Sequence, residues 1–207
     1  MENKIAVISP SSIMTKKIKK IIEEEKMEII VREATREKAV NEVEELILQG
    51  VKVFISRGVT ATILREKFDI PVINIRHTFF DCYNAYINAK KISSQIAFLA
   101  TSNDFNIILN KSKDFLIGAE IITINNLDNI DNKLKEIFSR GYRVAIGGLT
   151  LKEKVLKLGI DYVMTEADNY SLIKAIEDAE HILKIEIESE NQRIDIEYSI
   201  SYDVKYK

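Results

Sequence analysis

One pattern occurs twice in this sequence, as Gly50-Val-Lys-Val-Phe-Ile-Ser-Arg-Gly-Val-Thr60 and as Gly141-Tyr-Arg-Val-Ala-Ile-Gly-Gly-Leu-Thr150. Each copy has an opening glycine, a basic residue, a short apolar run and a closing Gly-x-Thr, and the second copy is shorter by one residue. The apolar run has the length of a buried strand, and the glycine and threonine stand where a helix begins. The repetition predicts two related α/β halves.

Apolar runs alternate with segments of helical periodicity on both sides of these two copies. The runs at 5–8, 28–31, 51–55 and 72–75 predict the strands of a first lobe, and those at 95–99, 120–124, 143–146 and 161–164 predict the strands of a second. Parallel strands need crossover connections and are buried on both faces. We therefore expect an α/β fold of two Rossmann-like lobes with parallel, doubly wound sheets and a cleft between them, arranged as in periplasmic binding proteins.

The expected organisation has five parts. Residues 1–77 form the first lobe, residues 78–94 an aromatic-rich interlobe helix, and residues 95–166 the second lobe. Residues 167–188 form a helix that packs back toward the first lobe, and residues 189–207 form an extension or a linker to an output domain. In this last part, apolar residues from Ile194 to Tyr206 alternate with polar ones, which predicts a strand with one buried face, at a domain boundary or a dimer contact.

Composition excludes several classes of function. The formal net charge is -2, from 30 basic and 32 acidic residues, so we expect no direct binding of nucleic acid. Cys82 is the single cysteine, which excludes an intramolecular disulfide and favours the cytoplasm. The chain begins without a secretory pattern and contains no apolar run of the roughly 20 residues that span a bilayer, so we expect no membrane association.

Polar residues at the strand ends are the candidate ligand-binding residues, because ligands of open α/β sheets bind at the carboxyl ends of strands. Hydroxyls, amides and glycines at helix starts suit an anionic or carbonyl-bearing ligand. Arg57 adds a permanent positive charge, and its planar guanidinium group can bind a carboxylate or phosphate through two N–H groups. The same residue types also serve as helix caps and turns, which is an equally good interpretation of any single one. The candidates are Ser9, Ser11, Ser12, Ser56, Arg57, Gly58, Thr60, Thr78, Asp81, Thr101, Ser102, Asn103, Gly147, Gly148 and Thr150.

Catalytic and cofactor patterns are weak. The two histidines, His77 and His181, have no nucleophile partner in the sequence, and with one cysteine they do not suggest a zinc site. The sequence has no Gly-x-x-x-x-Gly-Lys-Ser/Thr loop and no Gly-x-Gly-x-x-Gly after the first strand. We therefore expect neither a catalytic residue, a metal nor a cofactor.

Several segments together resemble a known family. They are Ile55-Ser-Arg-Gly-Val-Thr-Ala61, Leu64-Arg-Glu-Lys, Ile70-Pro-Val72, Asp81 and Val144-Ala-Ile-Gly-Gly-Leu-Thr150. Over about residues 3–185 the chain is similar to the N-terminal sensor domain of propionate catabolism activators, the PrpR type of sigma-54-dependent transcriptional regulator. The resemblance implies a two-lobed sensor in which a small organic acid, 2-methylcitrate in members that sense propionate metabolism, relieves inhibition of a downstream ATPase.

By position, the residues that match the family's first motif are Ser56, Arg57, Gly58 and Thr60. Gly147 and Gly148 match its second motif, and Asp81 matches an acidic residue of the family. This chain has Val59 and Leu149 where the family usually has further glycines. Both side chains narrow the space for a ligand against the backbone. The ligand expected here is therefore a small anionic organic acid, 2-methylcitrate-like or smaller.

The sequence thus predicts a non-enzymatic, ligand-sensing regulatory domain, with the downstream ATPase and DNA-binding domains of the full regulator as partners and a homodimer as a further association. Three alternatives remain. A cytosolic racemase-like or isomerase-like enzyme would draw its acid and base from His77, Asp81, Cys82 and Asp104. A solute-binding carrier is disfavoured by the missing signal peptide. A dimerisation module would bury apolar side chains between the lobes instead of hydroxyls.

Overall fold

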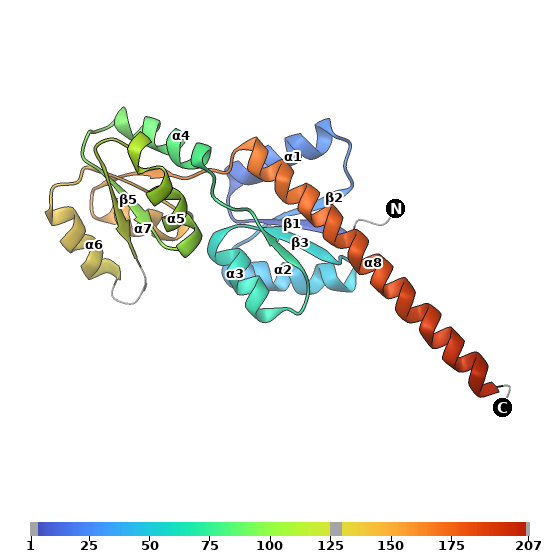
Figure 1. Ribbon diagram of the computed structural model, residues 1–207. Coiled ribbons are helices and arrows are strands. Elements are labelled where there is room, and N and C mark those ends of the chain that lie inside the picture. Colours follow the sequence, from blue (N-terminus) through green and yellow to red (C-terminus); the bar gives the residue numbers. More distant parts are fainter. Residues whose placement is uncertain (1–3, 125–129, 206–207) are drawn as a thin grey trace.

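The apolar runs form two parallel sheets of four strands each, in two lobes that lie side by side (Figure 1). The computed structural model describes residues 4–124 and 130–205, and within this range the side chains of residues 103–104 and 195–205 are not described. The first sheet has the order β2-β1-β3-β4 and the second the order β6-β5-β7-β8. The expected fold class, two doubly wound α/β lobes, is confirmed.

The first sheet contains β1 (Ile5–Ser9), β2 (Ile29–Glu33), β3 (Val53–Ser56) and β4 (Val72–Asn74). The connecting helices are α1 (Ser12–Glu24), α2 (Arg36–Leu48) and α3 (Gly58–Lys67). The chain leaves β1 for β2 and then returns past β1 to β3, so its crossovers lie on opposite faces of the sheet. Consequently α1 packs on one face, through Met14 and Ile18, while α2 and α3 pack on the other, through Val43 and Leu64.

The second lobe repeats this plan with β5 (Ile96–Ala100), β6 (Ala119–Thr123), β7 (Val144–Gly147) and β8 (Asp161–Met164). Its helices are α4 (Phe79–Lys90), α5 (Asn103–Lys111), the short η1 (Lys113–Phe115), α6 (Ile130–Ser139) and α7 (Leu149–Lys157). The central strands β5 and β7 are fully buried, which explains why they appear in the sequence as continuous apolar runs. The two copies of the repeated pattern form β3 with the start of α3 and β7 with the start of α7.

Each lobe is completed by a helix that follows the last strand of the other lobe. Helix α4 follows β4 but packs on the second sheet, where Cys82 and Ala85 contact the cluster around Phe98. Helix α8 (Asn169–Lys205) follows β8 but packs on the first sheet, through Leu172 and Ile176. The chain therefore crosses between the lobes twice, once between β4 and α4 and once between β8 and α8.

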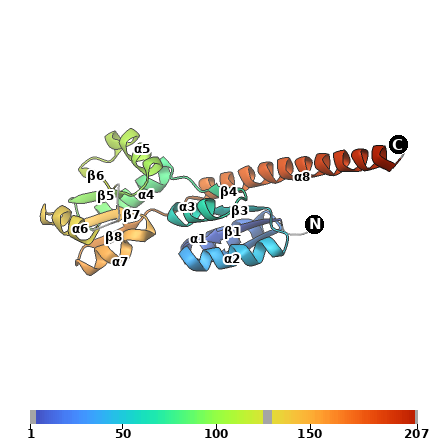
Figure 2. The same cartoon turned by 90° about the horizontal axis from the view of Figure 1, so that it is seen from below.

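Helix α8 corrects the expectation for the end of the chain. The alternation from Ile194 to Tyr206 predicted a strand, but α8 continues as helix to Lys205, and Tyr206 lies outside the described residues. Figure 2 shows this helix extending past the first lobe into solvent. A strand there would need a sheet edge to pair with, whereas an existing helix lengthens by one hydrogen bond per residue without a new nucleation cost. An ion pair between Lys52 and Glu190 is the outermost described contact of α8 with the lobe.

Candidate functional site at the junction of the lobes

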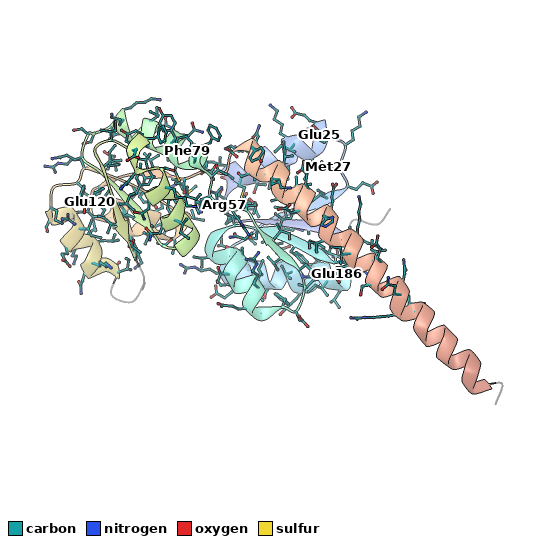
Figure 3. The ribbon with its side chains drawn as sticks, in the orientation of Figure 1. Glu25, Met27, Arg57, Phe79, Glu120 and Glu186 are labelled. Carbon is teal, nitrogen blue, oxygen red and sulfur yellow. The ribbon has the colours of Figure 1, made fainter. Side chains whose placement is uncertain are left out.

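Arg57 lies where the two lobes meet (Figure 3). It directly follows β3 and is the N-cap of α3, in an extended conformation. The next residue, Gly58, has a φ of +59°, and its N–H donates to Asn74 Oδ1 at 3.2 Å. This left-handed turn favours glycine and starts the helix immediately after the arginine. The Arg57 side chain is only 8% exposed.

Asp81 of α4 is the ionic partner of Arg57. Arg57 Nη2 donates to Asp81 Oδ2 at 2.7 Å, and the Asp81 side chain is fully buried. The same carboxylate accepts from the backbone N–H of Thr78 at 3.2 Å, and Thr78 Oγ1 accepts in return from the Asp81 N–H, which makes a capping box at the start of α4. The ion pair thus joins the first lobe to a helix of the second.

Asp168 ties the second crossing to the first. Its backbone N–H donates to Asp81 Oδ1 at 2.9 Å, and its carboxylate accepts from Thr78 Oγ1 at 3.3 Å and from the Ser171 N–H at 2.7 Å. One residue earlier, the carbonyl of Ala167 accepts from Lys17 Nζ of α1 at 2.7 Å. Both crossings are therefore held by one hydrogen-bonded network centred on Asp81.

His77 makes an aromatic contact across the same junction. Its ring stacks on Phe105 of α5 with the centroids 4.3 Å apart, and its Nε2 is 3.5 Å from Thr165 Oγ1. Burial, and secondarily the charge of Arg57, lowers the pKa of His77 to about 3. The imidazole is therefore neutral across the physiological range and acts as a packing group.

A cavity of about 280 Å³ opens beside this network, between α1, α4 and the second crossing. Three carboxylates, one ammonium group and two amides line it, together with two apolar side chains. These residues are Lys17, Asp81, Asn84, Ala85, Asn88, Met164, Glu166 and Asp168. Since they come from both lobes and from the crossing, a molecule bound here would contact every part that must move if the lobes rotate.

Two buried polar atoms at the junction have no hydrogen-bond partner among the described residues. They are Arg57 Nη1 and Glu166 Oε1. Burial raises the pKa of Glu166, against the opposing charges of Lys17, Arg57 and Lys152. Buried donors and acceptors without partners are rare in folded proteins and often mark a place for a ligand or water. The junction therefore has one free donor on a cation and one free acceptor on a carboxyl group.

Three other sequence candidates of the first lobe, all serines, bond to backbone groups of the same lobe. Ser56 Oγ donates to the carbonyl of Ile8 at 2.8 Å, and Ser9 Oγ donates to that of Ser11 at 2.9 Å. Ser11 caps α1 by accepting from the N–H of Met14. Ser12 is exposed at the start of α1, and Thr60 is buried within α3.

In the second lobe the candidates lie at the starts of helices or pack closely against a neighbouring side chain. Ser102 caps α5 by accepting from the Phe105 N–H, and Gly148 is the N-cap residue of α7. Gly147 lies against Tyr162, whose hydroxyl donates to the Gly148 carbonyl at 2.6 Å. The remaining candidates are Thr101 and Thr150, both partly exposed, and Asn103, which begins α5 and whose side chain lies outside the described residues.

A second cavity, of about 290 Å³, lies at the opposite end of the second sheet. Its lining includes Gln95, Gly118 and Gly141, which precede strands, and Arg140, which is already bound to Glu120. Because ligands of parallel sheets bind at the carboxyl ends of strands, the junction cavity is the better candidate.

Sequence reasoning placed Arg57, Thr78 and Asp81 among the binding residues, and the structure brings these three together. It did not find Lys17, Asn84, Asn88, Glu166 or Asp168. One signal was available, because Glu166 and Asp168 are acidic residues directly after the buried strand β8. Lys17 and the two asparagines lie on exposed-looking helix positions that carry no such signal.

Comparison with known families decides the classification. The sequence model described as "propionate catabolism activator" (PrpR_N) matches residues 23–189, well over half of the chain. The chain belongs to this PrpR_N family. It is thus a regulatory domain of the kind found in propionate catabolism activators. No curated protein sequence is significantly similar to this chain.

One solved structure shares the fold of this domain over nearly the whole chain. A crystal structure of an NtrC family transcriptional regulator from Clostridium acetobutylicum superposes with a TM-score of 0.75, at 23% identity, covering 90% of this chain and 99% of that one. The Escherichia coli transcriptional repressor ascG has a TM-score of 0.37 at 9% identity, with 88% and 92% covered. A periplasmic solute-binding protein from Actinobacillus succinogenes with bound D-allose has a TM-score of 0.38 at 14% identity, with 78% and 76% covered.

No helix among the described residues combines the length and the apolar character that a membrane span requires. No group of three or more His, Cys, Asp and Glu side chains within the described parts is arranged to hold a metal ion.

Proposed function

We propose that this PrpR_N domain is a cytoplasmic sensor that binds a small organic acid at the junction of its lobes and controls the ATPase and DNA-binding domains of a sigma-54-dependent activator. The observation that carries the proposal is the buried, unpartnered Nη1 of Arg57. A guanidinium with a free N–H in a low-dielectric site binds a carboxylate oxygen strongly. Beside this arginine, Lys17 supplies a cation in the lining of the adjacent cavity.

The size and charge of the cavity favour a small acid with few carboxylates. About 280 Å³ accommodates a compact metabolite. Asp81, Glu166 and Asp168 line the same space, so each further carboxylate on the ligand meets more repulsion. The acid is therefore less charged than 2-methylcitrate.

The double crossing gives the ligand a means of signalling. A ligand shifts the lobe arrangement only as far as it binds one arrangement more tightly than the other. The junction network contains residues of both lobes and of both crossings, so its geometry changes whenever the lobes rotate. Helix α8 begins at this network and extends past the first lobe, which makes it the element that transmits the change.

The pKa values of the junction argue against the enzyme alternative. Burial, assisted by the charge of Asp81, raises the pKa of Cys82 to about 12, and the pKa of His77 is lowered to about 3. A thiol that stays protonated and an imidazole that stays neutral do not form the poised acid and base that racemisation or isomerisation needs.

The test is a thermal-shift titration of the domain with propionate, lactate, succinate, citrate and 2-methylcitrate. A ligand that binds only the folded state raises the melting temperature in a saturable way. Replacing Lys17 with Met keeps the apolar stem and removes the charge, so this variant should bind the acid at least tenfold more weakly. Arg140→Ala is the matched control, because Arg140 is an exposed cation at the far cavity.

The sensor proposal fails if no carboxylate, amino acids included, produces a saturable shift. It also fails at this site if Lys17→Met and Arg140→Ala bind the same acid as tightly as the original chain.

A further inference from the structure

The junction cavity contains an unmet acceptor that an ordinary carboxylic acid does not satisfy. Asp81 accepts from Arg57 and from two backbone N–H groups, and Asp168 accepts from Thr78 and Ser171. Glu166 Oε1 is buried and has no partner among the described residues. A ligand that carried only carboxylates would leave this oxygen unpaired and add a like charge beside it.

Lys17, the cation that lines the cavity together with Glu166, makes no hydrogen bond to Glu166 Oε1. The charge of Lys17 lowers the pKa of Glu166, against the larger effect of burial. The Nζ of Lys17 donates its hydrogen bond to the Ala167 carbonyl instead. An ammonium group has three donors, so Lys17 keeps donors for a ligand as well. The cavity therefore has an acceptor without a donor, Glu166 Oε1, and a cation with further N–H donors, Lys17.

These two features demand opposite charges on the ligand. An amine without an acid group would be repelled by Lys17, and an acid without an amine would be repelled by Glu166. A molecule with both groups turns each repulsion into an attraction. The amides of Asn84 and Asn88, which line the cavity from α4, can donate to or accept from either end.

We propose that the ligand sensed at this junction is an amino acid, with its ammonium group donating to Glu166 Oε1 and its carboxylate bound on the side of Lys17. This inference rests on the proposed function, because it specifies the class of acid that the sensor binds. Ala85 and Met164 supply the apolar part of the wall against which a short aliphatic side chain would pack.

The experiment compares matched probes. The twenty standard amino acids are screened by thermal shift and isothermal titration, and each one that binds is compared with its deaminated acid and its decarboxylated amine, as with alanine, propionate and ethylamine. We expect at least one amino acid to bind tenfold or more tightly than either matched compound, since the deaminated acid leaves Glu166 Oε1 unpaired and the decarboxylated amine gives up the attraction to Lys17.

Two variants identify the groups. Glu166→Gln keeps the size of the side chain and removes its charge, so it should reduce the preference for the amino acid over its deaminated acid to less than about threefold. Lys17→Met should reduce the preference over the decarboxylated amine in the same way. Glu120→Gln is the control, because Glu120 lies in the second lobe away from Arg57 (Figure 3) and should leave both preferences unchanged.

The outcomes separate this inference from the proposed function. If deaminated acids bind as tightly as the amino acids, the amino-acid assignment is wrong and the sensor proposal stands. If the preference for amino acids survives Glu166→Gln, the assignment to Glu166 is wrong. If neither acids nor amino acids bind, both proposals are rejected.

Discussion

Arg57 Nη2 and Asp81 Oδ2 lie 2.7 Å apart in a buried ion pair that connects the start of α3 in the first lobe with α4 on the second. The pair costs desolvation on both sides, and removing one partner leaves the other charge buried and uncompensated. Arg57→Ala should therefore lower the free energy of unfolding by about 3–5 kcal/mol. Urea denaturation followed by circular dichroism measures this change.

The control for Arg57→Ala is Arg140→Ala. Arg140 also bonds to a carboxylate, that of Glu120, but both side chains are about half exposed, so the pair is screened by water. We expect no measurable shift of its urea midpoint. Equal effects of the two substitutions would mean that the buried pair contributes nothing beyond an ordinary surface contact.

His77 should make stability depend on pH below neutrality. Its pKa is about 3 in the folded protein and close to 6.5 in the unfolded chain, so between these values the unfolded state binds one more proton. Stability is then fully present above about pH 6.5 and is lost as the pH falls, by at most roughly 1.4 kcal/mol per pH unit from this residue.

His77→Phe provides the comparison, because it preserves an aromatic ring for the stack on Phe105 without a titrating group. Urea midpoints measured between pH 7 and pH 4.5 should fall more steeply for the original chain than for the variant. Parallel pH profiles would show that the imidazole titrates in the folded state as freely as in the unfolded chain.

The fold was predictable because it depends on local periodicity. Apolar runs such as 51–55 and 143–146 are marked by their length and by the glycines that bound them, and they became β3 and β7 with little adjustment. The parallel order follows from the helices between them. Membership of the family was also evident from the ordered segments around Arg57 and Gly147, and it is confirmed.

The junction depends on geometry that periodicity does not encode. Lys17, Arg57, Asp81 and Asp168 come from four separate elements, and only the double crossing brings them together. Most of the serines and threonines of the predicted binding loops are committed to helix caps or to nearby carbonyls, as Ser11 and Ser56 show. A polar residue after a strand serves both uses equally well, and the sequence does not distinguish them. Their role in binding remains a prediction.

Gly147 should not tolerate a side chain. A Cβ at this position would lie 2.6 Å from the hydroxyl of Tyr162 and 3.2 Å from the carbonyl oxygen of Leu99. Both neighbours are held, since the tyrosine hydroxyl bonds to the Gly148 carbonyl and Leu99 belongs to β5. We expect Gly147→Ala to destabilise the domain by about 1–3 kcal/mol, the usual cost of overpacking.

The adjacent glycine is the control for this prediction. A Cβ on Gly148 would meet nothing within 4 Å, and its φ of -82° suits any residue. Gly148→Ala should therefore change the melting temperature little, while Gly147→Ala lowers it by several degrees. Similar melting temperatures for the two variants would indicate that β7 and β8 separate easily to admit a methyl group.

The alternating apolar and polar residues at the end of the chain predicted a strand, but they form part of α8. The prediction was wrong because the same residues can also extend a helix that is already formed. Among the described side chains beyond Leu183, no apolar residue of α8 belongs to the core of the first lobe, and the Lys52–Glu190 pair is the outermost described contact. A chain ending at residue 192 should therefore melt at nearly the same temperature as the full chain. Its far-ultraviolet circular dichroism should lose helical signal in proportion to the helical residues removed.

The same truncation also separates helix from strand. If the last residues formed a strand paired with another copy of the chain, their removal would lower the melting temperature in a concentration-dependent way and increase the helical fraction of the spectrum. The helical arrangement requires the opposite, a smaller helical fraction at constant stability. Under the proposed function, the length of α8 beyond the first lobe would carry movement at the junction outward from Asp168 and Ser171.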